Sequence, residues 1–360
     1  MNTRVKYAKN CATALPQVLP HVTSEEMLNR AVGALQGLAL GDALGMPTQS
    51  MSAQWIREAY GSIDGLNDAI EHQPIAPRMP AGSITDDTEQ ALIVAQLIID
   101  GQGHIDALAL AHRLLDWEDD MKRRGSFDLL GPSTKLALEQ IRQGADSRTT
   151  GRTGTTNGAA MRVAPVGIAN PSHDIDRLAH RIYESCKVTH NTVHGFESAA
   201  MVATAVSLGI DGASVHDALE GAVDAVSAMQ SHIQNFDCAW SPKADVMARV
   251  RKALDIAYVQ SSESDFLHAL QYECGTSVES NESIPVACAL AWRYNNDPFK
   301  ALCVAASLGG DTDTIAAICG AILGAAGMAH LFPDGVVETV TEVSHLQLLP
   351  VAEGLLAVRR

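Results

Sequence analysis

Two short segments of this chain each combine a pair of carboxylates with a pair of hydroxyls. They are Thr85-Asp86-Asp87-Thr88 and Asp311-Thr312-Asp313-Thr314, and each leads into an apolar run with helical spacing. One aspartate in such a place is explained by capping, because a carboxylate accepts from the first backbone N–H groups of a helix. Two aspartates and two threonines exceed what a cap needs, so both segments are candidate sites of chemistry.

If the two helix N-termini face each other, four carboxylates and up to four hydroxyls meet. A divalent cation, or a pair, relieves the repulsion, and an all-oxygen ligand set suits Mg²⁺ or Mn²⁺ rather than zinc. Two ions about 4 Å apart orient a substrate and activate a water molecule. The spacing leaves open whether the segments meet, and a capping box of Asp86 with Glu89, or of Asp87 with Gln90, would account for one aspartate.

Two further features are candidates for binding. Asp42 falls on the apolar face of its predicted helix, where a carboxylate needs either a cation or local N–H donors. The segment 147–168 is rich in glycine and threonine and carries Arg148, Arg152 and Arg162. It is either a phosphate-binding loop, since glycine lets backbone N–H groups approach an anion and arginine matches phosphate, or a mobile surface loop.

A histidine pair is a weaker candidate. His190 and His194 have the i, i+4 spacing of a zinc pair, but Asn191 follows His190, so the HExxH pattern is absent, and no third ligand is near in the sequence. We therefore disfavour zinc and expect His194 to be a structural or loop-exposed residue.

The composition narrows the class of protein. Of 360 residues, 46% are hydrophobic and only 4% are aromatic, so the core is built from small aliphatic side chains, which favours close-packed helices. A net charge of −16 disfavours broad binding to nucleic acid or to an anionic membrane. The 7 cysteines include no CxxC pair, which argues against a disulfide framework and a Cys-rich zinc site.

No targeting segment is evident. Residues 1–20 lack the continuous apolar stretch of a secretion signal, and the longest uncharged run, 315–329, is shorter than the about 20 residues that span a bilayer. We therefore expect a soluble cytoplasmic protein without a nucleic-acid or membrane partner.

The spacing of apolar residues predicts an all-α chain without a convincing strand. A first helix begins at Ser24, and its glycines recur every fourth residue as one bare stripe, which indicates close packing against another backbone. A second helix follows Asp87. Further helices are predicted over 104–120, 132–143, 174–188, 195–208, 213–232, 242–259, 283–294, 297–306, 314–330 and 334–344. We expect a loosely ordered extension over 1–23, a long loop with at most one short helix over 46–82, and one domain over 24–360.

Four segments, taken in order, resemble the ADP-ribosylglycohydrolase family. They are GALQGLALGDALGMPTQ, SITDDTEQALIVAQLI, TNGAAMRVAPVGI and SLGGDTDTIAAICGAILGA, within a likeness that runs from about Leu28 to Leu331. The paired TDDT and GGDTDT motifs are specific to that family. FDLLGPSTKLALEQI resembles more loosely its Gly-Thr-rich segment that binds substrate, and KVTHNTVHGFESAA resembles its Thr-His segment before a helix. The resemblance implies a compact all-α orthogonal bundle with a magnesium or manganese pair at its centre.

The resemblance also implies a set of site residues and a reaction. The implied metal ligands are Thr85, Asp86, Asp87, Asp311, Asp313 and Thr314. The implied substrate-binding residues are Gln49, Gly131, Ser133, Thr134, Asn157, Gly158, Met161, His190, Gly309 and Gly310. The reaction would be hydrolysis of an N- or O-glycosidic bond at the ribose anomeric carbon of an ADP-ribosylated protein or a small nucleoside-like molecule. One of the catalytic aspartates, Asp86, Asp87 or Asp313, would take the proton of the attacking water.

One position departs from the family pattern. Gln49 follows the GDALG segment where many members have a glutamate, and an amide can bind a hydroxyl but cannot take a proton. This leaves two alternatives to a standard enzyme of the family: a hydrolase of a different small glycoside, and a catalytically weak ADP-ribose binder. The third alternative is a protein of another kind, either a metal-dependent phosphoesterase or a purely structural helical protein.

Overall fold

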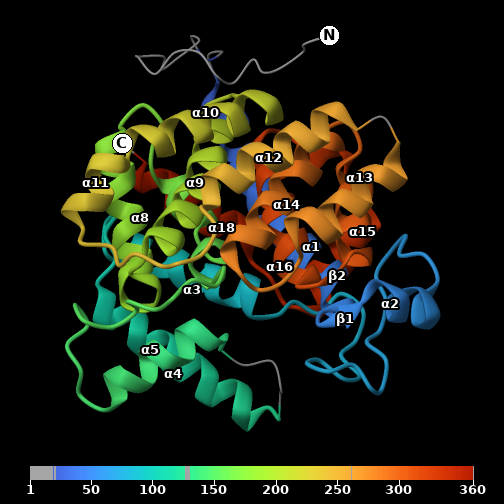
Figure 1. The fold of residues 1–360 in the computed structure, drawn as a ribbon, viewed down its shortest axis with the longest axis horizontal. Coiled ribbons are helices and arrows are strands. Elements are labelled where there is room, and N and C mark those ends of the chain that lie inside the picture. Colours follow the sequence, from blue (N-terminus) through green and yellow to red (C-terminus); the bar gives the residue numbers. More distant parts are fainter. Residues whose placement is uncertain (1–18, 20–21, 126–129, 261, 360) are drawn as a thin grey trace.

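Two helices at the centre of the molecule, α1 (Ser24–Gly45) and α16 (Thr312–Ala325), pack with their backbones in contact (Figure 1). The structure is a computed structural model and describes residues 19, 22–125, 130–260 and 262–359. A Cβ atom on Gly37 would stand 2.0 Å from the carbonyl oxygen of Gly320, and one on Gly320 would stand 1.9 Å from that of Gly37. No side chain fits between them, which confirms the close packing predicted from the stripe and identifies α16 as the partner.

The start and the end of α1 are both fixed by specific contacts. At its start, the Thr23 hydroxyl accepts from the Glu26 N–H and the Glu26 carboxylate accepts from the Thr23 N–H, which is a capping box. At its end, a Cβ on Gly45 would stand 2.4 Å from the Cα of Asp313. The end of α1 therefore lies directly against the second acidic segment.

The other described helices surround this pair. They are α2 (Ala53–Tyr60), α3 (Asp86–Asp100), α4 (Ala107–Arg123), α5 (Pro132–Arg142), α6 (Gly158–Met161), α7 (Ala164–Ala169), α8 (Ile175–His190), α9 (Val193–Ile210), α10 (Val215–Ala228), α11 (Gln230–Asn235), α12 (Val246–Val259), α13 (Glu263–Ala269), α14 (Ser280–Arg293), α15 (Pro298–Ser307), α17 (Asp334–Val343) and α18 (Leu348–Val358). Single turns of 3₁₀ helix occupy Met46–Thr48 and Met328–Leu331, and a π-helical turn occupies Leu270–Cys274. Two-residue strands, β1 (Met51–Ser52) and β2 (Gly309–Gly310), pair antiparallel.

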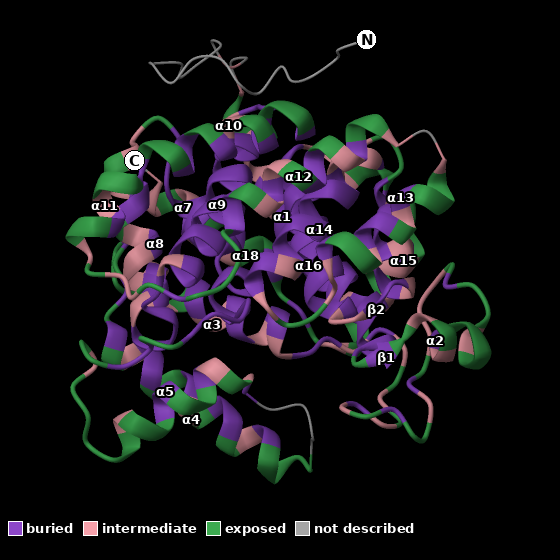
Figure 2. Cartoon of the chain, viewed as in Figure 1, coloured by how far each residue is buried: buried purple, intermediate pink, exposed green. Residues whose placement is uncertain are grey.

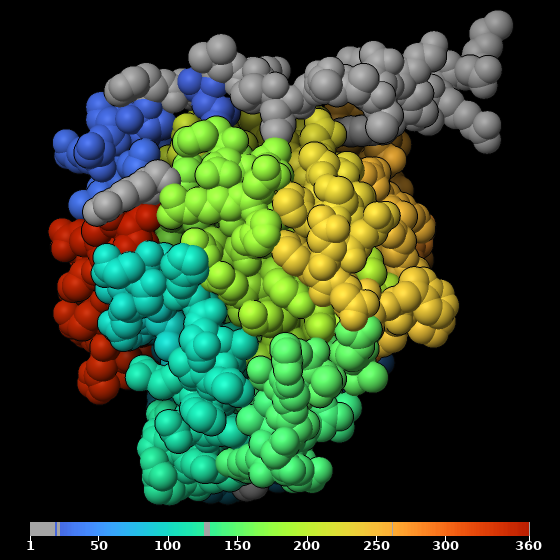
Figure 3. All heavy atoms as spheres, turned by 90° about the vertical axis from the view of Figure 1, so that its left-hand side faces the viewer, coloured from blue at the N-terminus to red at the C-terminus, as the bar shows by residue number. Residues whose placement is uncertain are grey.

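Burial is concentrated in the middle of this arrangement. Buried residues colour most of α1, α9, α14 and α16, whereas α2, α4 and α5 lie at the lower edge of the view with exposed outer faces (Figure 2). In the described chain, α9 alone is long and apolar enough to cross a membrane by composition, and 94% of that stretch is buried inside the structure. In the side view, the C-terminal residues lie next to the segment around residue 100, as expected from the packing of α18 on α3 (Figure 3).

The predicted all-α class is confirmed, with some differences in the elements. The predicted helix 213–232 is divided into α10 and α11, and the helix predicted to reach residue 330 ends at Ala325. Four helices were not predicted: α6 and α7 inside 147–168, then α13 and α18. Every residue of α6 and α7 is buried, so these short glycine-containing helices are held by tertiary packing rather than by their own propensity. Of the predicted extension 1–23, only Leu19, Val22 and Thr23 are among the described residues.

The glycine contact between α1 and α16 predicts a large effect of one methyl group. Gly37→Ala places a Cβ against backbone that cannot move alone, so we expect a loss of at least about 1–3 kcal/mol in the free energy of unfolding. Urea denaturation followed by circular dichroism measures it. The matched control is Gly335→Ala in α17, where nothing lies within 4 Å of the added Cβ. Equal stability of the two variants would contradict the proposed contact.

Candidate active site at the N-termini of two core helices

The structure brings the two acidic segments together. The Thr314 hydroxyl, in the first turn of α16, donates to Oδ2 of Asp87 in the first turn of α3 at 3.2 Å. Burial first, and then neighbouring negative charge, raise the pKa of Asp87 well above its usual range. The charges responsible belong to Asp313, Asp86, Asp42 and Asp311. Carboxylates from three separate parts of the chain therefore act on one another.

Asp42 of α1 caps α3 from outside that helix. Its two carboxylate oxygens accept from the backbone N–H of Thr85 at 3.0 Å, and one of them accepts from the N–H of Thr88 at 3.1 Å. The hydroxyls of both threonines donate to it as well. Burial raises the pKa of Asp42 to about 6, against the opposing effect of these hydrogen bonds. Of the two partners considered for Asp42, a cation or local N–H donors, the structure shows the N–H donors.

Because Asp42 supplies the cap, neither predicted capping box forms. Thr85 is the N-cap residue of α3 and makes no side-chain capping bond. Asp86 instead accepts from Nε2 of Gln90 at 3.0 Å, one turn along the helix. The predicted capping roles of Asp86 with Glu89 and of Asp87 with Gln90 are therefore wrong, and both aspartates lie in the first turn with another residue doing the capping.

The second acidic segment is held by its neighbours in a similar way. The Asp311 backbone N–H donates to the carbonyl of Thr276 at 2.7 Å, and the Asp311 carboxylate accepts from Nδ2 of Asn157. Burial raises the pKa of Asp311, and the hydrogen bonds from Asn157 and Thr314 oppose that shift. Asn157 was predicted from the resemblance as a substrate-binding residue. The structure places it at the acidic cluster itself.

The threonines of the two motifs divide into structural and site-facing residues. The Thr312 hydroxyl donates to the carbonyl of Gly45 at 3.0 Å and accepts from Thr48 at 2.9 Å, so it fastens α16 to the end of α1. The hydroxyls of Thr85 and Thr88 both donate to Asp42. Thr314 is the one that turns toward the carboxylates of the other segment. This division was invisible in the sequence, where the four threonines look alike.

The donor set fits a hard divalent cation. Only oxygen ligands are present, from carboxylates and hydroxyls, and Oδ1 of Asp87 is buried without a hydrogen-bond partner among the described residues. Within those same residues, no three Asp, Glu, His or Cys side chains stand in a finished metal-binding arrangement. Cation binding at this place would therefore require the carboxylate side chains to turn toward a common point.

Several predicted substrate-binding residues lie close together. A Cβ on Gly158 would stand 3.0 Å from Cε1 of His190 and 3.3 Å from the hydroxyl of Thr134, so the two side chains meet over this glycine. Met161 is buried on the same short helix α6, and Gly131 and Ser133 at the start of α5 are half-buried. Residues 127–129 of the predicted segment 127–141 lie outside the described residues.

Gly309 and Gly310 have a backbone role. Both have positive φ values, +81° and +84°, and they pair as β2 with β1. A Cβ on Gly310 would stand 2.2 Å from the carbonyl oxygen of Thr276. Only glycine allows this crossing, which turns the chain directly into Asp311. Gly309 and Gly310 therefore position the acidic segment through their backbone conformation.

Gln49 is buried, and its side-chain Nε2 has no hydrogen-bond partner among the described residues. Its backbone carbonyl accepts from Nε2 of Gln73 at 2.9 Å, and the next residue, Ser50, donates its N–H to Gly310. Gln49 is therefore anchored by its backbone beside the second acidic segment, while its NH₂ group is buried without a protein partner among the described residues.

Sequence reasoning misassigned the arginines of segment 147–168. Arg148 and Arg152 are paired with Asp146 and Asp237 near the surface. Arg162 is completely buried and donates to side chains of α3 and α8. The alternative of a mobile surface loop is wrong for residues 158–168, all of which are buried. Arg162 is thus a core residue rather than a phosphate ligand.

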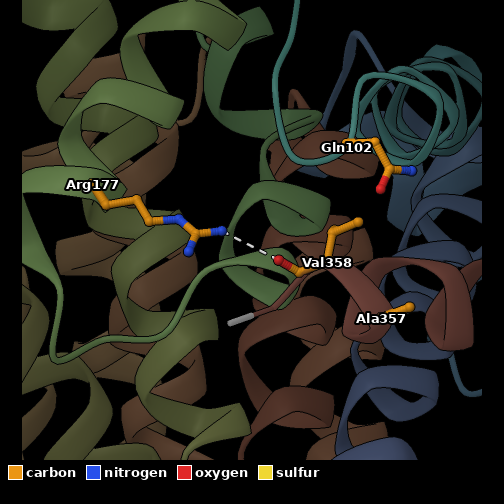
Figure 4. Close-up of a pocket in the computed structure, with 4 residues that line it drawn as sticks. All are labelled: Gln102, Arg177, Ala357 and Val358. Atoms are coloured by element: carbon orange, nitrogen blue, oxygen red, sulfur yellow. Dashed lines mark hydrogen bonds between the residues drawn. The ribbon is translucent and has the colours of Figure 1, made fainter.

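The remaining candidates lie outside this site. His194 is buried in α9 and its Nε2 lies 3.0 Å from the carbonyl of Ala244, so it is a structural residue. A separate pocket of about 180 Å³ near the C-terminus is lined by Gln102, Arg177, Ala357 and Val358, and Arg177 reaches across it to donate to the Val358 carbonyl (Figure 4). That pocket contains none of the predicted site residues.

Comparison with known proteins identifies the class of protein that this fold and site define. A family model described as ADP-ribosylglycohydrolase matches residues 23–360. The chain belongs to the ADP-ribosylglycohydrolase family, and it is a glycosyl hydrolase of that type.

Individual relatives agree with this assignment. The protein YegU of Escherichia coli (strain K12) is 33% identical over 82% of this chain and 87% of its own. The ADP-ribosylarginine hydrolase Tri1 of Pseudomonas putida (strain GB-1) is 29% identical over 91% of this chain and 78% of its own. A solved structure titled ADP-ribosylglycohydrolase-related protein complex superposes with a TM-score of 0.67 at 23% identity, covering 93% of this chain and 100% of that one. The last similarity concerns the fold.

The capping of α3 by Asp42 predicts a specific loss of stability. In Asp42→Asn, an amide oxygen at the Oδ1 position leaves the Thr88 N–H facing an NH₂ group, and one at the Oδ2 position leaves the Thr85 hydroxyl facing it, at a cost of about 1–3 kcal/mol. Asp106→Asn is the control, because Asp106 is an exposed N-cap of α4 and asparagine caps equally well. Denaturant unfolding of both variants checks this, and an equal, small effect would contradict the capping role.

The carboxylate cluster predicts an unusual pH dependence. Burial raises the pKa of Asp42, and burial together with repulsion raises that of Asp87, so the folded protein binds protons more tightly than the unfolded chain. Without divalent cations, their contribution to stability is full below the ordinary carboxyl pKa of about 4 and is lost as the pH rises through the folded pKa. Asp87→Asn should therefore make the melting temperature, measured in EDTA, decrease less as the pH rises. A wild-type minus variant difference that stays constant with pH would refute this assignment.

Proposed function

We propose that this protein hydrolyses the glycosidic bond at the ribose anomeric carbon of an ADP-ribosylated substrate, with two divalent cations, Mg²⁺ or Mn²⁺. The single observation that carries the proposal is the convergence of two acidic helix N-termini on a buried Asp87 oxygen that has no hydrogen-bond partner in the described part of the chain. Because burial and the mutual repulsion there raise the pKa of Asp87, cation binding would relieve an energetic cost that the fold otherwise bears.

The proposed ligands are the oxygens of both motifs: Thr85, Asp86, Asp87, Asp311, Asp313 and Thr314. A bound cation pair supplies a Lewis acid that holds the ribose hydroxyls and lowers the pKa of a water molecule. The protein's part is to hold these oxygens in place. Asp42 holds the start of α3, and Asn157 holds Asp311. One of Asp86, Asp87 and Asp313 takes the proton from the attacking water.

The substrate side of the site lies over α6. Gly158 lets Thr134 and His190 approach the same point, and His190, whose pKa burial lowers well below its usual range, lines this point as a neutral ring. We place the ADP-ribose here, with Gly131, Ser133 and Met161 along its path. The name of the relative Tri1 suggests an arginine-linked group as the acceptor to test first.

A second candidate function is binding without efficient turnover. The observation that favours it is Gln49, because its buried amide lies where many relatives have a glutamate and cannot accept a proton. In this case the protein would hold ADP-ribose and cations, and product would form slowly or not at all.

Product release distinguishes the two functions. Mass spectrometry follows ADP-ribosyl-arginine and ADP-ribosyl-serine peptides, ADP-ribose, NAD and nucleosides, each with Mg²⁺, Mn²⁺ or EDTA. We expect cation-dependent cleavage of an ADP-ribosyl bond, reduced at least about 100-fold in Asp311→Asn because a ligand oxygen is lost. Asp265→Asn, an exposed residue of α13, is the control. Cleavage that proceeds equally in EDTA would refute the metal-dependent mechanism.

Gln49→Glu tests the second candidate directly. If the missing carboxylate limits turnover, this variant should raise kcat by about 10-fold or more, the range of a positioned general base. ADP-ribose should stabilise both proteins against heat. A kcat that stays unchanged or falls would show that catalysis does not depend on a carboxylate at this position.

A further inference from the structure

Arg162 is a buried cation with unusual partners. Its side chain is completely inaccessible, and among the described residues no carboxylate lies within ion-pair distance of it. Its two terminal nitrogens donate to neutral side chains: Nη1 to Oε1 of Gln90 at 2.9 Å, and Nη2 to Oγ1 of Thr189 at 2.6 Å. Removing a guanidinium from water costs several kcal/mol unless its surroundings compensate. The burial of Arg162 is therefore costly. Each of its two hydrogen bonds begins a chain of contacts, called an arm below, that leads toward the proposed active site.

The first arm reaches the metal-binding side. Because Oε1 of Gln90 is held by the guanidinium, its amide nitrogen must point the other way, and it donates to Oδ2 of Asp86 at 3.0 Å. A flipped amide would place NH₂ against the guanidinium and its oxygen against the carboxylate. Arg162 thus fixes the orientation of Gln90, and Gln90 fixes one oxygen of Asp86.

The second arm reaches the substrate side. The Thr189 hydroxyl accepts from Arg162, and within the described hydrogen bonds its own proton has one acceptor, Nδ1 of His190 at 2.9 Å. A buried hydroxyl proton without an acceptor is costly, so Nδ1 accepts and the ring proton sits on Nε2. Nε2 then donates to the Thr156 hydroxyl at 3.0 Å. The next residue, Asn157, donates to Asp311.

We propose that Arg162 is a positioning residue that orients Asp86 and His190 together and fixes His190 as the neutral Nε2–H tautomer. The two terminal nitrogens of one guanidinium thus connect the first acidic segment, through Gln90, to residues 156–158, through Thr189 and His190. A point charge such as lysine cannot occupy both acceptors in this geometry. The catalytic part of this inference rests on the proposed function, whereas the tautomer of His190 does not.

The tautomer is tested on the full chain by ¹⁵N NMR of histidine-labelled protein, which distinguishes protonated from unprotonated ring nitrogens. We expect a wild-type His190 with its proton on Nε2, and a changed or mixed tautomer in Thr189→Val, which keeps the shape and removes the hydroxyl. Arg152→Lys, a surface arginine of the same segment, is the control and should leave the signal unchanged. A wild-type proton on Nδ1, or no change in Thr189→Val, would overturn the inference.

The arm to Asp86 is tested by Gln90→Glu. A carboxylate there still accepts from Arg162, and the attraction to the guanidinium offsets the repulsion between its second oxygen and Asp86, so the melting temperature should change little. We expect kcat to fall about 10- to 100-fold and Mn²⁺ affinity, measured by electron paramagnetic resonance, to fall with it. A purely structural role predicts no loss of kcat and Mn²⁺ affinity without a loss of stability. Unchanged kcat and Mn²⁺ affinity would overturn the proposal.

The two failures are distinguishable. If the wild-type protein releases no product from any ADP-ribosyl substrate, the proposed function is wrong. The His190 tautomer and the Mn²⁺ titration still decide whether Arg162 positions these groups, because neither readout requires turnover.

Discussion

The backbone contact between α1 and α16 is the constraint on which the site depends. Glycines on both helices bring the two axes together, and the contact ends where Gly45 meets Asp313. Thr312 and Thr48 then bind the end of one helix to the start of the other. Asp42, one turn before Gly45, extends from the same helix to cap α3. The helix α1 thereby fixes the position of both acidic segments. A larger distance between α1 and α16 would move these segments apart.

Residues of one chemical type have different roles at this site. Asp42, Thr88 and Thr312 are satisfied within the protein and hold the framework. Burial raises the pKa of Asp87 and Asp311, as it does for Asp42, and neighbouring negative charge raises that of Asp87 further. The framework residues supply the donors and the acceptors that let carboxylates remain so close together. The price of that closeness is electrostatic, and a divalent cation is the ligand that would remove it.

The sequence was informative where the signal is local. The glycine stripe of α1 predicted close packing, and the two acidic motifs predicted helix starts, because spacing and capping chemistry act over a few residues. It could not identify the partner of the stripe or the partners of Asp42, which lie far along the chain. Neither alternative that the sequence left open for Arg162, a phosphate ligand or part of a mobile surface loop, anticipated its place in the core, because only the fold shows its burial. The short helices α6 and α7 escaped detection because tertiary packing, not propensity, holds them.

The order of the elements along the chain has a consequence for biosynthesis. α1 is made early and α16 late, so on the ribosome the glycine stripe has no partner until almost all of the core helices have been synthesised. Until then α1 exposes its bare backbone, and the acidic loops cannot meet. The two acidic segments can therefore meet only after α16 has been made. Damage to α16 would leave a nascent chain with a long-lived exposed surface, a state that chaperones recognise.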